Sequence, residues 1–206
     1  MLPRGITRLE AQNLACIRGG RLVFRGLNFA LQTGAALAIE GPNGAGKTSL
    51  LRMIAGFLSP ASGKILFQIK TGEISDGEER GKFAGWLGHH DGVKPQLTVS
   101  ENLKFFAQLY GANVPVESAL SETGLARLAR LPGQYLSAGQ KRRLALARLK
   151  LSNRPLWLMD EPLASLDASG KKLASEMIAA HCASGGMVIA ATHEPLGVDC
   201  AKLVLA

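Results

Sequence analysis

The chain has 206 residues, of which 47% are hydrophobic and 19% charged, and it carries a net charge of +8. This length can bury a sizeable core without disulfides or metals, and no apolar run approaches the ~18 residues that a membrane-spanning helix needs. The basic residues are scattered without interleaved aromatics, which does not specifically indicate nucleic acid, and residues 1–8 lack a signal-peptide pattern, so we expect a cytoplasmic protein.

The first predicted elements form a small antiparallel unit. Residues 9–14 and 22–31 have the composition of two strands, joined by the turn Arg18-Gly19-Gly20. In the second strand Leu27 and Phe29 alternate with polar or small residues, which indicates that one face of the strand is buried.

A phosphate-binding loop follows. Residues 41–48, Gly-Pro-Asn-Gly-Ala-Gly-Lys-Thr, fit the pattern of Gly, four residues, Gly-Lys and Ser or Thr. A predicted buried strand at 35–39 precedes the loop and a predicted helix at 49–55 follows it, as the pattern requires. Glycines let backbone N–H groups approach phosphate oxygens, Lys47 can reach the β- and γ-phosphates, and the Thr48 hydroxyl can ligate Mg²⁺. The predicted nucleotide-binding residues are Gly41, Pro42, Asn43, Gly44, Ala45, Gly46, Lys47, Thr48 and Ser49.

The next segment returns to strands. A strand is predicted at 64–69 and another at 82–88, which ends at His89-His90. Residues 71–80, between these strands, contain two glycines and four acidic side chains, a composition typical of a surface loop.

Helices dominate the middle of the chain. Thr98 begins a helix through a capping box with Glu101, and a shorter helix is expected at 114–124. We therefore expect a helical subdomain at about 95–150, inserted in the α/β core of one domain that spans residues 1–206.

Two further stretches carry polar groups at element ends. Residues 136–140 form a small-residue turn before a helix at 141–151, which is either a second anion site or a simple helix cap. Asp160 and Glu161 follow an apolar strand at 156–159, and ligands of open α/β sheets bind at that end of the strands. Asp160 can hold Mg²⁺ through water, and Glu161 is placed to accept a proton from an attacking water.

The last predicted elements are a helix at 168–183 and a buried strand at 187–191, which ends in Thr192-His193. Because strands and helices alternate along the chain, the sequence predicts a parallel sheet.

Together these stretches resemble ATP-binding-cassette (ABC) ATPases. In that comparison Leu136, Ser137, Ala138, Gly139 and Gln140 are similar to the signature motif, Ser165, Leu166 and Asp167 to the D-loop, and His193 to the switch histidine. The resemblance implies a P-loop NTPase of the α/β class with a RecA-like core, a small antiparallel β subdomain and a helical subdomain. It also implies ATP and Mg²⁺ as ligands, Glu161 and His193 as catalytic residues, and a homodimer in which the signature of one copy completes the ATP site of the other.

The resemblance can be narrowed to one subfamily. Residues 86–94 and residues 136–148, with Ala138 in place of the commoner glycine, are similar to the ATP-binding subunits of the haem exporter of bacterial cytochrome c maturation. This implies an ATPase on the cytoplasmic face of the inner membrane that binds an integral membrane permease subunit and powers haem delivery. No nucleic acid partner and no direct haem contact are expected.

Two positions depart from the broader ABC pattern. Where many cassettes place an aromatic residue against adenine, this chain has Ile17-Arg18, and an Arg guanidinium can stack on a base. Where most cassettes have a glutamine, this chain has His89, or alternatively His90. In that position His89 would approach Mg²⁺ or water.

Other functions stay open beside this one. The nearest alternative is the ATPase subunit of another ABC exporter, since the membrane subunit selects the substrate. A soluble ABC-type ATPase that acts on nucleic acid is the second, although such proteins usually need coiled-coil or zinc-bearing insertions that the sequence lacks. A P-loop GTPase would carry a guanine-reading Asn/Thr-Lys-x-Asp stretch, and none is present.

Overall fold

The structure is a computed structural model that describes residues 5–112 and 115–206. An antiparallel sheet has the strand order β2-β1-β4-β5, formed by β1 (Ile6–Arg18), β2 (Arg21–Gln32), β4 (Ser62–Ile69) and β5 (Gly72–Ile74). The predicted hairpin is confirmed, but its strands extend to the turn at Gly19-Gly20, where both glycines have positive φ.

A second sheet is parallel throughout and has the strand order β6-β7-β8-β3-β9. Its strands are β6 (Ala84–Leu87), β7 (Leu156–Asp160), β8 (Met187–Ala191), β3 (Ala36–Glu40) and β9 (Ala201–Val204). The predicted parallel sheet is confirmed. The edge strand β9 has no counterpart among the predicted elements, because it is only four residues long and three of these residues are exposed.

The helices are α1 (Lys47–Ile54), α2 (Gly77–Gly81), α3 (Val99–Tyr110), α4 (Val116–Glu122), α5 (Ala138–Leu151) and α6 (Ala168–Ala183), with short 3₁₀ turns at Ala126–Leu128 and Gly133–Tyr135. The capping box of Thr98 and Glu101 is present at the start of α3. The helix predicted at 114–124 corresponds to α4, although its first predicted residue lies outside the described residues. Among the residues that the structure describes, no helix is long and apolar enough to cross a membrane.

Residues 71–80 lie at the surface as predicted, with seven of the ten exposed, but the prediction that they form a loop is wrong. This segment instead forms β5 and the short helix α2, which Asp76 caps by accepting a hydrogen bond from the backbone N–H of Glu79 at 2.9 Å. Arg80 is buried, and its guanidinium donates to the carbonyl oxygens of Met53 and Ile65 at 3.0 and 3.2 Å. The charged composition is misleading here because backbone carbonyls, rather than water, bind the arginine.

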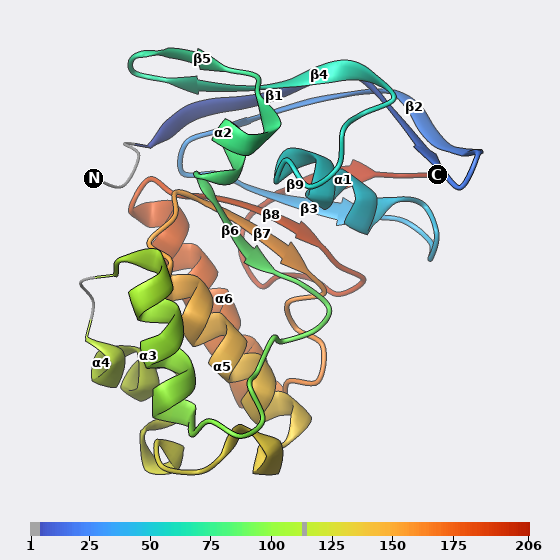
Figure 1. The fold of residues 1–206 in the computed structure, drawn as a ribbon. Helices are drawn as coiled ribbons and strands as arrows, with labels where there is room; N and C mark the ends of the chain where they lie inside the picture. Colours follow the sequence, from blue (N-terminus) through green and yellow to red (C-terminus); the bar gives the residue numbers. More distant parts are fainter. Residues whose placement is uncertain (1–4, 113–114) are drawn as a thin grey trace.

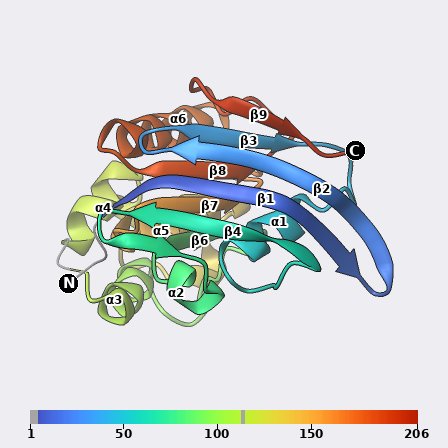
Figure 2. The same ribbon diagram turned by 90° about the horizontal axis from the view of Figure 1, so that it is seen from above.

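Three apolar clusters hold these layers together. The first lies between the antiparallel sheet, α1 and one face of the parallel sheet, and the second lies under α5 and α6 on the opposite face. The third joins α3, α4 and α5 in a helical region beside the sheets. Viewed from above, the antiparallel sheet covers the parallel one, and α3 and α4 stand to the side (Figures 1 and 2).

His181, next to the second cluster, should make the free energy of unfolding depend on pH. Its ring stacks on Trp157 with centroids 3.9 Å apart and 7° between the planes, and burial lowers its pKa to about 4. The unfolded chain therefore takes up a proton first as the pH falls below ~6.5, so the folded state loses stability, and the loss grows until the pH reaches about 4.

We expect the free energy of unfolding to fall by on the order of 1 kcal/mol more between pH 7 and pH 5 in the wild type than in His181→Phe. Phenylalanine keeps a ring against Trp157 but cannot titrate. Urea unfolding of both proteins at the two pH values measures this fall. An equal fall in the wild type and in His181→Phe would show that His181 is not held neutral.

Candidate functional site

A cleft of about 780 Å³ opens at the carboxyl ends of the parallel strands. It brings together the phosphate loop, the end of β7, the residue after β8 and the hairpin of the antiparallel sheet. Its lining residues are Arg18, Val23, Pro42, Asn43, Gly44, Gly46, Lys47, Thr48, Ser49, Arg52, Trp86, Gly88, His89, His90, Asp160, Glu161 and His193.

Two glycines give the phosphate loop its path. Gly41 has φ +146°, and a Cβ there would lie 2.3 Å from the carbonyl oxygen of Leu205. Gly46 has φ +97°, and a Cβ there would lie 2.6 Å from Cγ1 of Val23. Glycine is therefore required both by backbone conformation and by close packing against neighbouring strands. Gly46 precedes α1 without a side-chain cap, which leaves the first N–H groups of the helix available to an anion.

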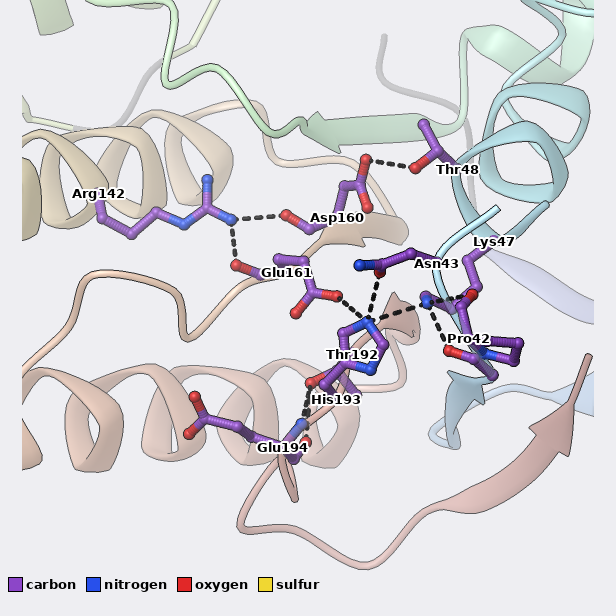
Figure 3. A network of polar contacts seen from close by, with 11 residues as sticks. Pro42, Asn43, Lys47, Thr48, Arg142, Asp160, Glu161, Thr192, His193 and Glu194 are labelled. Carbon is purple, nitrogen blue, oxygen red and sulfur yellow. Dashed lines mark hydrogen bonds and ion pairs between the residues drawn. The ribbon is translucent and has the colours of Figure 1, made fainter. Parts of the chain in front are cut away.

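Lys47 is held in the cleft by its own loop. Its ammonium group donates to the carbonyl oxygens of Gly41 at 2.7 Å and Pro42 at 3.2 Å, and its Nζ lies 3.1 Å from Nε2 of His193 (Figure 3). These contacts keep a buried positive charge at the mouth of the loop, where a polyphosphate would provide the counter-charge.

Thr48 and Asp160 come from different elements and meet across the cleft. The hydroxyl of Thr48, in the first turn of α1, donates to Oδ2 of Asp160 at 2.9 Å, at the end of β7 (Figure 3). A hydroxyl and a carboxylate are oxygen ligands of the kind that Mg²⁺ prefers, so this pair fits the predicted metal.

Glu161 and His193 face each other beside the loop. Oε1 of Glu161 lies 3.5 Å from Nε2 of His193, and Oδ1 of Asn43 lies 3.2 Å from the same nitrogen (Figure 3). Nε2 can accept from Lys47 only when it carries no proton, and it can donate to Glu161 or Asn43 only when it carries one. The imidazole can therefore exchange between two sets of partners as its protonation or tautomer changes.

His89 and His90 both line the cleft and are both exposed. Their rings meet edge to face with centroids 5.5 Å apart. Because both side chains border the same space, the assignment of His89 rather than His90 to the glutamine position stays a prediction. Arg18 also lines the cleft at the end of β1, as expected for a residue that stacks on a base.

The residues that resemble the signature and the D-loop lie elsewhere. Within the described residues, none of 136–140 or 165–167 lines the cleft. A separate depression of about 490 Å³ is lined by Gly124, Leu125, Leu128, Ser137, Ala138, Gly139, Gln140, Arg143, Ser165 and Asp167. Leu136 and Leu166 are buried and anchor the two stretches.

The two stretches of this depression are fitted to each other. Ser137 caps α5 in a capping box with Gln140, and a Cβ on Gly139 would lie 2.8 Å from the carbonyl oxygen of Ser165. Asp167 caps α6, and the N–H of Gly170 together with the guanidinium of Arg143 lowers the pKa of its carboxyl. The capped start of α5 thus lies at the surface, away from the cleft of the same chain.

Some residues at the site escaped the sequence analysis. Val23 on β2, Arg52 on α1 and Trp86 on β6 also line the cleft, although no role at the site was expected for any of them. Arg142 binds the backbone at Asp160 and Glu161 from behind (Figure 3). In the sequence it lies in the basic run Lys141-Arg142-Arg143, inside the stretch 136–148 that carries the resemblance, and no role was expected for it.

The fold defines a class of protein, the ABC-type ATPases, and a family model described as ABC transporter matches residues 24–164. The "Cytochrome c biogenesis ATP-binding export protein CcmA" of Paramagnetospirillum magneticum is 50% identical over 200 residues, which cover 94% of this chain and 91% of that protein. The protein of the same name from Nitrobacter winogradskyi is 49% identical over 197 residues, covering 95% and 96%. An ABC transporter ATP-binding protein from Pyrococcus furiosus superposes with a TM-score of 0.83 at 26% identity, covering 96% of this chain and 97% of that one. The chain belongs to the ABC transporter family, among the ATP-binding CcmA proteins.

Proposed function

We propose that this chain is the ATP-hydrolysing subunit of a membrane complex that exports or delivers haem for the biogenesis of c-type cytochromes. The observation that supports ATP hydrolysis is the convergence of Lys47, Thr48, Asp160, Glu161 and His193 in one cleft. Support for the haem pathway comes from the relatives, whose printed names describe cytochrome c biogenesis and export, and which match this chain over nearly its whole length.

In this proposal each residue has a task in the in-line attack of water on the γ-phosphorus. Lys47 and the loop N–H groups hold the phosphates, and Thr48 with Asp160 would hold Mg²⁺, which supplies positive charge to the phosphate oxygens. Glu161 orients the water and accepts its proton, and His193 contacts the γ-phosphate. Arg18 stacks on the base, and His89 would contact Mg²⁺ or water at the open side of the cleft.

The position of a second set of residues supports a homodimer. Ser137, Gly139 and Ser165 line a depression separate from the cleft of their own chain, which suits contact with a nucleotide held by another copy. Head-to-tail pairing of two copies joins each cleft to a partner's helix start and forms two composite sites. The same subunit binds an integral membrane permease at the cytoplasmic face of the inner membrane.

The haem pathway is tested in cells from which the gene has been deleted. Return of the wild-type gene should restore haem-stained c-type cytochromes in membrane fractions, and return of an equally abundant Lys47→Ala variant should not. The b-type cytochromes serve as the control, since they require haem but no export, and their spectra should not change. Normal levels of c-type cytochromes in the deletion strain would reject the haem assignment.

A further inference from the structure

Arg142 connects three parts of the chain: its own helix α5, residues 88–91 and residues 160–162. It lies in the second turn of α5 with 3% of its surface exposed. Its guanidinium donates to the carbonyl oxygens of Gly88 at 2.8 Å, Asp160 at 2.6 Å and Pro162 at 3.3 Å, to Oδ1 of Asp91 at 2.9 Å, and to the carbonyl oxygen of Glu161. Figure 3 shows the guanidinium directed at the backbone of Asp160 and Glu161.

These acceptors explain how a charge is tolerated at this depth. All three nitrogens of the guanidinium donate, and the carboxylate of Asp91 neutralises the charge within hydrogen-bonding distance. Lysine has one nitrogen and cannot reach acceptors spread over this width, so the site is specific for the planar fork of arginine.

The contact acts on the backbone that carries Glu161. Glu161 has φ +50°, a left-handed conformation that is disfavoured for a residue with a Cβ. Its N–H donates to the carbonyl oxygen of Ala191 at 2.8 Å, and its own carbonyl oxygen accepts from Arg142. Both peptide groups around Glu161 are therefore fixed, and the side chain projects toward His193.

A second arginine on the same helix shows what is particular to this contact. Arg148 donates to the carbonyl oxygen of Asp91 at 2.7 Å, so the segment at 88–91 is held to α5 without Arg142. Only Arg142, of these two, also binds the end of β7. Arg142 therefore fixes the backbone of Glu161 relative to Gly88 and Asp91, which flank His89 and His90.

We propose that Arg142 is a positioning residue for ATP hydrolysis, which holds the backbone of Glu161 in its left-handed conformation and at a fixed place relative to residues 88–91. The inference rests on the proposed role of Glu161. Arg142 does not line the cleft, so its loss should lower turnover and leave nucleotide affinity almost unchanged. A 1 Å shift of a catalytic group is enough to cost about a hundredfold in rate.

Arg80 is a matched control for the loss of a buried arginine. It is 5% exposed and also binds backbone carbonyls, those of Met53, Ile65 and Ser75, but it does not line the cleft. Arg80→Gln and Arg142→Gln therefore remove comparable structural interactions, and only the second removes a contact to Glu161.

The experiment measures phosphate release and binding of N-methylanthraniloyl-ATP by the full chain, with the number of analogue molecules bound per chain. We expect Arg142→Gln to bind one analogue per chain with Kd within about threefold of the wild type, while kcat per bound nucleotide falls at least about tenfold. Arg142→Lys, which keeps the charge beside Asp91, should lose kcat in the same direction by a smaller factor. Arg80→Gln should have a lower melting temperature but a kcat per bound nucleotide within about twofold of the wild type.

Three outcomes would overturn the inference: an unchanged kcat per bound nucleotide in Arg142→Gln, an equal loss in Arg80→Gln, or a fall in binding stoichiometry that accounts for the lost rate. If Arg142→Gln does not fold, the same comparison of kcat with Kd in Arg142→Lys decides. A wild-type chain that binds the analogue but never releases phosphate would instead reject ATP hydrolysis itself, and this inference with it.

Discussion

Lys47→Ala should lower the rate of ATP hydrolysis about a hundredfold or more while the chain stays folded. The ammonium group is a fixed positive charge next to the phosphate position, and its partners Gly41 and Pro42 are carbonyl groups of the loop rather than core residues. Truncation removes no packing from the three apolar clusters. The measurement is phosphate release at saturating ATP, together with a thermal melting curve.

Lys172→Ala is the control for this change. The side chain of Lys172 is 78% exposed on α6, and its ion pair with Glu176 is long, at 3.8 Å. Its removal should leave turnover within about twofold of the wild type. If Lys47→Ala hydrolyses ATP at a near-wild-type rate with an unchanged melting curve, the assignment of the phosphate loop is wrong.

Glu161→Gln should nearly abolish hydrolysis, by roughly a hundredfold to ten-thousandfold, and should accumulate an ATP-bound dimer. Glutamine keeps the size and shape of the side chain but cannot accept the proton of the water. Nucleotide binding and the closure of two copies do not need that proton, so the complex forms and cannot proceed. Gel filtration with and without ATP separates the dimer from the monomer.

A second substitution tests how that dimer is built. Ser137→Arg in the Glu161→Gln background places a bulky cation at the surface that should face the partner's nucleotide, and the dimer should no longer accumulate. Loss of the helix cap costs about 1 kcal/mol, so melting curves must show that the chain is still folded. A Glu161→Gln chain that binds ATP and elutes as a monomer would contradict the composite site.

The parts of the site that could be predicted are those that a few residues adjacent in the sequence form on their own. The phosphate loop, the carboxylates after β7 and the capping boxes at Thr98 and Ser137 each need a local pattern, and the structure places them in the expected elements. That the signature lies apart from the cleft follows from the resemblance to ABC ATPases, not from spacing.

The parts that could not be predicted depend on partners distant in sequence. Arg80 and Arg142 lie in charged stretches that have the composition of a solvated surface. Only the tertiary fold brings together the backbone carbonyl groups that bind their guanidinium groups in the interior. For Arg142 one signal existed: α5 contributes to two apolar clusters, and on a helix with two packed faces three consecutive basic residues cannot all point to water. Strand β9 is recognisable only by its pairing with β3.

The pairing of β3 also bears on the synthesis of the protein. The strand that leads into the phosphate loop has β8 and β9 as its neighbours in the sheet, and the nearer of these follows it by roughly 150 residues. On the ribosome, β3 therefore emerges as an apolar strand with no hydrogen-bonded neighbour, while α5 and β7 are completed before its partners are translated. Leu205, whose N–H donates to the carbonyl oxygen of Glu40 at 2.9 Å directly before the phosphate loop, arrives later still. A nascent chain consequently cannot complete the parallel sheet that carries the cleft until β8 and β9 have been made, and until then both edges of β3 are open to non-native pairing.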